Sequence, residues 1–409
     1  MIKYIKLRNF FSFKEQKIDI GNINVLIGIN ASGKSNLIKS FELLKEGARG
    51  NLHRLIVEKW GGFDAIFFTG ENSSTNERYF EIEIAFDSDL SYFGFIFPKN
   101  IVYKIRVTKS SGTDNYFVSE CLKYENEECN YVFGNLLSVN NGKGYVLKID
   151  KNGKLYYDKI NNKGQLKERR FDAREMALST AFDSEFYPHI NAVSAAMKDI
   201  AIYPYFDTSP TGNIRKSTNA TGDKILASDG GNLAMILNTV KLKDKTAYKQ
   251  IVNYLKDINP YFNGIDINVF GNSGKIELML DEEKLNASVH LAHISDGTLK
   301  FLCLLAILFN PEKSKFIIIE EPENGLHPDM ISLIAKGIKA ASGEASFLLT
   351  TQSEKFLDQF DLENLMVVEK SKENFSIVKT FKDSDFKKWY DNYFLGEMWS
   401  KGDLGGTRW

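Results

Sequence analysis

The segment at residues 28–35, GINASGKS, constrains the fold of this chain more than any other feature. In its pattern, G-x-x-x-x-G-K-S, the two glycines let the backbone curl so that successive N–H groups face the α and β phosphates of a nucleotide. An apolar strand at 24–27 precedes the segment, and apolar residues at helical spacing follow it. A random chain of 409 residues contains such a match with a probability of roughly one or two in a hundred. With this strand and helix around it, the pattern predicts a phosphate-binding loop.

Each residue of this loop has an expected task. Lys34 reaches the β and γ phosphates of a nucleoside triphosphate, and the Ser35 hydroxyl can bind Mg²⁺. The helix that follows points the positive end of its dipole at the anion. We therefore predict a nucleotide site formed by Gly28, Asn30, Ala31, Ser32, Gly33, Lys34, Ser35 and Asn36.

Composition and charge limit the class of protein. The 409 residues predict two to three lobes at about 150 residues each, and a hydrophobic share of 43% is enough for a core. A net charge of -1 excludes a chain-wide polycation but not a local basic groove. Three cysteines are too few for a disulfide framework or a zinc cluster. There is no signal-peptide pattern, and the longest apolar run, 299–309, is interrupted by Lys300 and too short to span a bilayer, so we expect a cytoplasmic protein.

The two ends of the chain are predicted to form one α/β layer around inserted lobes. Near the C-terminus, apolar helices alternate with buried strands, which is typical of a parallel sheet: helices 298–309, 329–340 and 353–359, strands 316–319, 346–350 and 364–368. The middle is expected to be mostly β at 79–158, with a hairpin at 150–153, mainly helical at 171–260, and strands again at 261–290. We predict an α/β fold with inserted β-rich and helical lobes, divided into 1–74, 75–160, 161–290 and 291–409.

Two acidic residues follow the buried strand 316–319. Such a strand delivers its last side chains to the ligand edge of an α/β sheet, where Glu320 can hold Mg²⁺ and Glu321 can polarise the attacking water. Neighbouring carboxylates are costly without a cation. The alternative is a strand end with solvated acids, and the upstream phosphate loop favours the metal-bound interpretation.

A polar turn opens the apolar helix 299–309. Ser295 or Asp296 is a good N-cap, and Gly297 allows a close backbone approach. By itself this is an ordinary capped helix. A hydroxyl beside free N–H groups at a helix start is also an anion site, and its place just before the acidic strand keeps that interpretation open.

The order of these motifs resembles that of ABC-type ATPases of the RecF, SMC and OLD-like group. The specific motifs lie within 1–47 and 290–360: Ile5, Leu7, Asn9, Phe10 and Phe13 at the start, 320–328 as Walker B and D-loop, and 350–353 as the switch. Residues 229–233, 395–399, Gly405 and Gly406 resemble, more loosely, a branch of standalone bacterial ATPases that is often linked to anti-phage defence.

The resemblance implies a P-loop ABC-type core in which two chains enclose two ATP molecules with Mg²⁺. Ser295, Asp296 and Gly297 of one chain would then cap the γ-phosphate held by Lys34 of the other. It also implies that Glu321, Lys34 and Gln352 are catalytic, and that Ser35 and Glu320 hold the metal. A homodimer or higher homo-oligomer follows.

The chain departs from the group's pattern at several positions. Glu320 replaces a more frequent Asp, and Gln352 replaces the switch histidine and cannot take a proton, so we expect slow hydrolysis. No glutamine lies between Gln16 and Gln165 to serve as the Q-loop residue. His327 stands where the D-loop Asp is expected, either as a contact across the dimer or as a helix-capping surface residue. His290 and His293 are too isolated for a metal site.

Three functional hypotheses remain open at this level. No TOPRIM nuclease or long heptad arm is recognisable, which favours an ATP-dependent sensor and scaffold that controls a separate effector, such as a nuclease, in anti-phage defence. The alternatives are a RecF-like DNA-binding clamp in repair or recombination and a non-hydrolysing assembly protein. The lysines at 241, 243, 245 and 249 are more typical of a solvated helix face than of a DNA contact.

Overall fold

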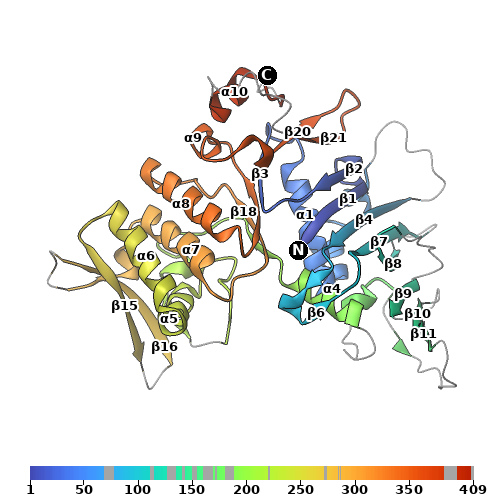
Figure 1. Ribbon diagram of the computed structural model, residues 1–409, viewed down its shortest axis with the longest axis horizontal. Helices are drawn as coiled ribbons and strands as arrows, with labels where there is room; N and C mark the ends of the chain where they lie inside the picture. Colours follow the sequence, from blue (N-terminus) through green and yellow to red (C-terminus); the bar gives the residue numbers. More distant parts are fainter. Residues whose placement is uncertain are drawn as a thin grey trace. The chain divides into compact units, whose positions relative to one another are not determined.

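The computed structural model describes residues 1–68, 78–110, 115–126, 135–140, 143–149, 154–159, 169–170, 173–179, 188–219, 222–270, 274–283, 285, 287–381 and 394–406 (Figure 1). The chain divides into two compact units. The first contains Met1–Gly21, Gly28–Ile200 and Val367–Lys379, and the second contains Asn22–Ile27, Ala201–Met366 and Thr380–Trp409. Both units therefore combine segments from distant parts of the chain. The division into four segments by sequence stays a prediction.

The first unit is built on a five-stranded antiparallel sheet with the order β2-β1-β4-β7-β8. Its strands are β1 (Ile2–Phe10), β2 (Phe13–Asp19), β4 (Tyr79–Phe86), β7 (Ile101–Lys109) and β8 (Tyr116–Tyr124). Strand side chains alternate between two faces, so apolar residues at every second position form a core. The predicted inner face of β7 is confirmed, because Ile101, Tyr103, Ile105 and Val107 are fully buried.

Helices complete the core of the first unit. The predicted apolar stripe of α1 (Lys34–Ala48) is confirmed, with Leu37, Phe41 and Leu44 fully buried, and α4 (Pro188–Lys198) contacts this helix. The smaller elements are α2 (Leu52–Arg54), η1 (Leu55–Lys59), α3 (Phe63–Ile66), β5 (Asp89–Leu90), η2 (Ser91–Phe93), β6 (Phe95–Ile96) and η3 (Ala177–Ser179).

A second antiparallel sheet in this unit has the order β12-β11-β10-β9. It contains β9 (Asn135–Asn140), β10 (Lys143–Ile149), β11 (Lys154–Lys159) and β12 (Arg169–Arg170). Ile149 pairs with Leu155, which confirms the predicted hairpin, although the turn at 150–153 lies outside the described residues. The prediction of mostly β structure at 79–158 is thus confirmed wherever this stretch is described.

The second unit contains a parallel sheet. Its strands are β13 (Ala201–Tyr203), β18 (Phe316–Glu320), β19 (Ser346–Thr350) and β3 (Ile23–Ile27), and β20 (Leu365–Lys370) follows β3 in the strand order. The chain passes from the second unit to the first within β20, which is next to β21 (Ser376–Thr380). The sequence did not indicate β13, because three residues are too few to show a strand period.

The helices of the second unit follow the predicted alternation. The predicted ones are α7 (Asp296–Phe309), α8 (Pro328–Ala341) and α9 (Glu354–Leu357), with α5 (Leu233–Lys243) and α6 (Lys245–Ile258) in the stretch predicted as mainly helical, whereas α10 (Leu395–Lys401) was not predicted. Helix α7 contacts α5, α6 and α8, and every residue from Phe301 to Leu308 is buried. A helix that is apolar on all sides must be covered in this way.

A third antiparallel sheet joins β14 (Thr218–Asn219), β16 (Lys275–Glu282), β15 (Phe262–Phe270) and β17 (Val289–His290). It confirms the predicted return to strands at 261–290. The short helices of this unit are η4 (Asn213–Arg215), η5 (Leu291–His293) and η6 (Leu362–Asn364). Across the part of the chain that the structure describes, no helix combines the length and apolar character that crossing a bilayer requires.

Candidate nucleotide site

The phosphate loop connects the end of β3 to the start of α1. Its backbone takes positive φ values at Gly28 (149°), Ala31 (63°) and Gly33 (120°), so the chain curls as the motif predicts. The Lys34 ammonium donates to the carbonyl oxygens of Gly28 at 2.6 Å and Ile29 at 3.1 Å. These contacts hold the lysine side chain over the loop, while Asn30, Ala31 and Ser35 are exposed.

Close packing explains why both ends of the loop are glycine. A Cβ on Gly28 would lie 2.2 Å from the carbonyl oxygen of Val368 and 2.9 Å from Ser32 Oγ. A Cβ on Gly33 would lie 2.3 Å from the hydroxyl of Ser376, which itself donates to the Ser32 carbonyl. The first residue of β21, Ser376, and the loop are therefore packed so closely that no side chain fits at Gly28 or Gly33.

The loop offers unused polar groups that fit a phosphate. Ser32 Oγ is buried and has no hydrogen-bond partner among the described residues. Helix α1 starts at Lys34, its N-cap Gly33 has no side chain to cap it, and its described first turn has no acidic residue. Because buried polar groups in proteins are almost always paired, an unpaired hydroxyl beside uncapped helix N–H groups fits a bound anion. The residues present thus fit a nucleotide phosphate.

Replacing Gly28 with alanine is expected to reduce the free energy of unfolding by about 2 kcal/mol or more, since the new Cβ meets a backbone oxygen in a strained φ region. Thermal unfolding of the variant measures the loss. Gly343→Ala is the matched control, because nothing lies within 4 Å of the added Cβ there. Equal melting temperatures for the two variants would show that this close packing does not exist in solution.

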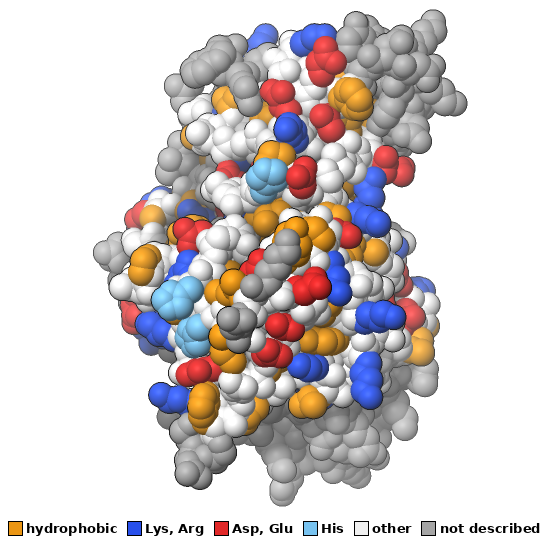
Figure 2. Space-filling view, turned by 90° about the vertical axis from the view of Figure 1, so that its left-hand side faces the viewer, with side chains coloured by type: hydrophobic (Ala, Val, Ile, Leu, Met, Phe, Trp, Pro, Cys, Tyr) orange, Lys and Arg blue, Asp and Glu red, His pale blue; other side chains and the backbone are white. Residues whose placement is uncertain are grey.

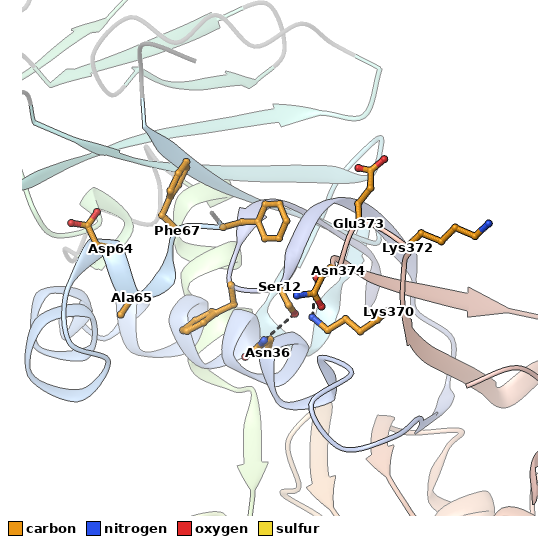
Figure 3. A pocket seen from close by; sticks show the side chains of 11 residues that line it. Ser12, Asn36, Asp64, Ala65, Phe67, Lys370, Lys372, Glu373 and Asn374 are labelled. Carbon is orange, nitrogen blue, oxygen red and sulfur yellow. Dashed lines mark hydrogen bonds between the residues drawn. The ribbon is translucent and has the colours of Figure 1, made fainter. Parts of the chain in front are cut away.

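A pocket of about 610 Å³ lies beside the loop in the first unit (Figure 3). Aromatic side chains and polar groups line it, namely Phe11, Ser12, Asn36, Asp64, Ala65, Phe67, Phe68, Lys370, Lys372, Glu373 and Asn374. Asn36 belongs to the predicted site and donates to Ser12 Oγ at 2.9 Å. No sequence motif indicated this pocket, although Phe11 and Ser12 lie between Phe10 and Phe13 of the opening segment.

The turn after β18, residues 321–325, is called the acidic turn below. It brings two predicted catalytic residues, Glu321 and Gln352, together. Gln352 Nε2 donates to Glu321 Oε1 at 2.7 Å. Glu321 has a φ of 45°, and its N–H donates to the Thr350 carbonyl at 3.0 Å and the Thr350 hydroxyl at 3.2 Å. Such backbone strain costs about 1–3 kcal/mol and persists where the surroundings hold it. The backbone of Glu321 is therefore fixed by Thr350 of the neighbouring strand, and its carboxylate is fixed by Gln352.

A buried carboxylate supports this pair. Glu323 is 9% exposed, and its Oε1 accepts from the Thr351 hydroxyl at 2.5 Å and the Gln352 N–H at 3.4 Å. Burial raises the pKa of Glu323 above its usual range. The sequence analysis included this residue only as part of the 320–328 motif. Its contacts show that it connects the acidic turn to the switch segment.

Lys300 links the turn to the helix before it. Its ammonium donates to the carbonyl oxygens of Glu321 at 3.1 Å and Asn324 at 2.6 Å, and burial lowers the pKa of this lysine. The sequence analysis did not assign it a role. One signal was present, because Lys300 is the one charged residue in the apolar run 299–309.

The turn formed by Ser295, Asp296 and Gly297, called the signature turn below, has the geometry of a capped helix. Ser295 is the N-cap of α7, and its hydroxyl accepts from the Thr298 N–H at 3.2 Å. A Cβ on Gly297 would lie 3.1 Å from the Gly325 carbonyl, so this glycine packs against the acidic turn of its own chain. The ordinary-cap interpretation is confirmed, and the anion-binding interpretation stays a prediction.

Two histidines of the second unit act as local caps. His327 is the N-cap of α8 and accepts from the Asp329 N–H at 3.4 Å, which confirms the helix-capping alternative. His290 accepts from the Ala292 N–H and lies 3.5 Å from a Glu277 oxygen. No group of three metal-ligating side chains occurs within the described ranges. The assignment of Ser35 and Glu320 to a metal stays a prediction.

The carboxyl ends of β3, β18 and β19 lie at one edge of the parallel sheet. Glu320 pairs with Thr350, and Thr350 pairs with Leu26. The phosphate loop begins at Gly28, directly after β3 ends at Ile27. Parallel α/β sheets bind their ligands at this edge. The separation of the Lys34 and Glu321 side chains stays a prediction, as do the roles of the individual site residues.

The fold is of the ABC type and resembles that of SMC heads. A crystal structure of an SMC head bound to the C-winged helix domain of ScpA is similar to this chain, with a TM-score of 0.58 at 15% identity, covering 94% of this chain and 99% of that one. An SMC head domain with an extended coiled coil, bound to the C-terminal domain of ScpA derived from Pyrococcus furiosus, has a TM-score of 0.54 at 13% identity, covering 95% and 98%. These similarities confirm the α/β ABC-type fold.

The family follows from the sequence match. A family model described as AAA domain, putative AbiEii toxin, Type IV TA system matches residues 23–358, which is more than half of the chain, so the chain belongs to this family. The DNA replication and repair protein RecF of Clostridium tetani is 42% identical over 59 residues. That match spans 14% of this chain and 15% of RecF.

Proposed function

We propose that this protein binds ATP and Mg²⁺ at the phosphate loop and hydrolyses ATP slowly within a dimer that closes around two nucleotides. The observation that carries the proposal is the Glu321–Gln352 pair at the carboxyl edge of the sheet from which the phosphate loop starts. ATPases of this kind need a phosphate cradle and a water-polarising carboxylate at such an edge.

In this proposal each residue has a separate task. Lys34 and the loop N–H groups bind the β and γ phosphates, and Ser35 and Glu320 hold Mg²⁺, which would neutralise phosphate charge. Glu321 accepts a hydrogen bond from the attacking water and orients it. Gln352 donates to Glu321 and can also donate to a γ-phosphate oxygen. Since Gln352 cannot take a proton, turnover is slow.

The signature turn would act on the nucleotide of a second chain. The first N–H groups of a helix are unsatisfied and carry partial positive charge, which suits a γ-phosphate. Helix α7 presents such a terminus behind Ser295, at Asp296 and Gly297. Supplying this terminus from the partner would make hydrolysis depend on dimerisation.

A mixing experiment tests the shared site. Lys34→Ala and Ser295→Arg should each be inactive alone, because one lacks the phosphate lysine and the other blocks the signature turn. In mixed dimers, the intact loop of one chain meets the intact turn of the other, so phosphate release should return. The matched mixture of Lys34→Ala with a second sample of Lys34→Ala should stay inactive. If Ser295→Arg alone keeps wild-type turnover, the shared site is refuted.

We propose that the pocket in Figure 3 holds the nucleobase and ribose. A flat aromatic ring system fits between phenylalanine side chains, and the polar groups around Ser12 and Asn36 suit ribose hydroxyls. Ala65→Trp should fill the pocket and weaken ADP binding about tenfold, whereas binding of inorganic tripolyphosphate should not change. Calorimetry with both ligands checks this, and equal losses for the two would place the base elsewhere.

We further propose that ATP binding lets this protein hold or release a separate effector, such as a nuclease, in bacterial anti-phage defence. The family description names a putative toxin and a toxin–antitoxin system, which supports a two-component arrangement. Co-purification of the neighbouring gene product, compared between wild type and Lys34→Ala, tests it. A partner that is retained equally by both proteins would exclude control by ATP.

A RecF-like DNA clamp is the second candidate, supported by the short match to RecF. The lysines of α5 do not favour it: Lys241 donates to the Ile265 carbonyl and Lys243 pairs with Glu312. Basic and acidic side chains are interspersed on the face in Figure 2. Binding to duplex DNA that falls steeply between low and moderate salt would support the clamp.

A further inference from the structure

One arginine in the second unit connects a distant loop to the segment that leads into the signature turn. Arg215 Nε donates to the Thr208 carbonyl at 2.8 Å. Its Nη1 lies 2.8–3.3 Å from three carbonyl oxygens, those of Leu291, Ala292 and Ile294. Its Nη2 donates to Asp296 Oδ1 at 2.5 Å. The residues on both sides of Ile294 are thus gathered around one guanidinium group.

The geometry of this contact is specific for arginine. The side chain is only 10% exposed, whereas Asp296 is 71% exposed. A guanidinium group presents five donors in a rigid planar fork, and five acceptor oxygens of the second unit, four carbonyls and one carboxylate, surround it. Arg215 is therefore committed to its own chain and is not placed as an arginine that reaches a phosphate.

The 229–233 motif, which has no assigned role, contacts the loop 208–215 that carries Arg215. Asn213, two residues before Arg215, donates to Asp229 Oδ2 at 2.9 Å. Gly230 has a φ of 73°, and a Cβ there would lie 3.2 Å from Cys303 Sγ and 3.3 Å from Ile214. The 229–233 motif thus packs between the loop that carries Arg215 and helix α7, to which Cys303 belongs.

We propose that Arg215 is a positioning residue. It fixes the position and orientation of the 295–297 turn, which would contact the triphosphate held by a second chain. The proposal rests on the function proposed above. Asp296 is the first residue of α7, so the ion pair connects Arg215 to the helix terminus itself. The carbonyl contacts hold Leu291, Ala292 and Ile294, which precede Ser295, at the same time. A turn held in this way is preorganised for a ligand that it meets only on dimerisation.

The full-length protein with Arg215→Ala tests the proposal. We expect kcat for ATP hydrolysis and ATP-dependent dimerisation to fall about 100-fold, since a displacement near 1 Å is enough for such a loss. Affinity for ADP, which lacks the γ-phosphate and uses the first unit, should stay within twofold. Arg215→Lys should not restore kcat, because an ammonium group cannot replace the fork. Lys216→Ala, an exposed neighbour that contacts Asn213, is the matched control and should keep kcat.

A second variant keeps the test valid if Arg215→Ala does not fold. Asp296→Ala removes the carboxylate that pairs with Arg215 but keeps the backbone N–H groups that are proposed to face the γ-phosphate, and it should lower kcat about tenfold with unchanged melting temperature. Adding Lys34→Ala protein to Arg215→Ala or Asp296→Ala protein should restore turnover, because the mixed dimer contains one site with an intact loop and an intact turn. A general folding defect cannot be rescued in this way.

The outcomes separate this inference from the proposed function. If wild type and Ser295→Arg behave as expected but both variants match wild type, the positioning role is wrong and the shared site remains. If ADP affinity falls in parallel with kcat, or if Lys34→Ala restores nothing, Arg215 has only a structural role. If wild type shows no ATP-dependent turnover or dimer, the proposed function fails and the inference fails with it.

Discussion

Replacing Glu321 with glutamine is expected to lower the rate of ATP hydrolysis by about 100-fold or more without weakening ATP binding. The amide keeps the shape of the side chain but cannot accept a proton from water. The phosphate loop belongs to the first unit and is unchanged, so the nucleotide still binds. With hydrolysis blocked, the ATP-bound dimer should accumulate. Phosphate release measures the first effect, and size-exclusion chromatography with light scattering, with and without ATP, measures the second.

The matched control is Glu363→Gln, an exposed glutamate of η6 in the same unit. It should hydrolyse ATP at the wild-type rate. Unchanged oligomerisation of Glu321→Gln with ATP would count against the shared site. If the wild type hydrolyses ATP and both Glu321→Gln and Lys34→Ala do not, the third hypothesis, a non-hydrolysing assembly protein, is excluded.

Replacing Lys34 with alanine is expected to weaken ATP binding by about 2–5 kcal/mol, because it removes a cation that faces several phosphate charges. Every tenfold loss in affinity corresponds to about 1.4 kcal/mol, so binding should fall by at least an order of magnitude. The ammonium is already held over the loop by the Gly28 and Ile29 carbonyls, and little side-chain entropy remains to be lost on binding. Calorimetric titration with ATP measures the change.

Lys256→Ala is the control for charge alone, since Lys256 is an exposed residue of α6. Both variants change the net charge equally, and only Lys34→Ala should lose affinity. An ATP affinity for Lys34→Ala within threefold of wild type would mean that the nucleotide does not bind at this loop. The phosphate-cradle interpretation of Ser32 would then be wrong as well.

The parts of the site that local sequence predicted share one property, which is that their determinants lie within about a dozen residues of each other. The loop at 28–35 contains its own glycines, lysine and helix start, and the strand 316–319 carries its acids at its own end. The cap at Ser295 follows the same rule. The spacing of apolar residues in α1 and β7, outside the site, predicted these elements for the same reason.

Residues that depend on distant partners were not predictable in this way. Lys300 was visible only as an interruption of an apolar run, and its partners, the carbonyls of Glu321 and Asn324, lie on another element. Glu323 meets Thr351, which is 28 positions away. Strand β13 is too short to show a period and exists because it pairs with β18.

The sequence by itself determined the chemistry of this protein: a loop that curls around phosphate, a strand that ends in carboxylates, and the alternating helices and strands that carry them. Local backbone geometry and side-chain period are sufficient for those features. Only the tertiary structure decided which other side chains hold these functional groups in place. Arg215 reaches Asp296 across 81 positions, and Gln352 reaches Glu321 across 31. Such pairs form because packing of the whole unit brings remote segments within hydrogen-bond distance, and no short window of sequence contains that information.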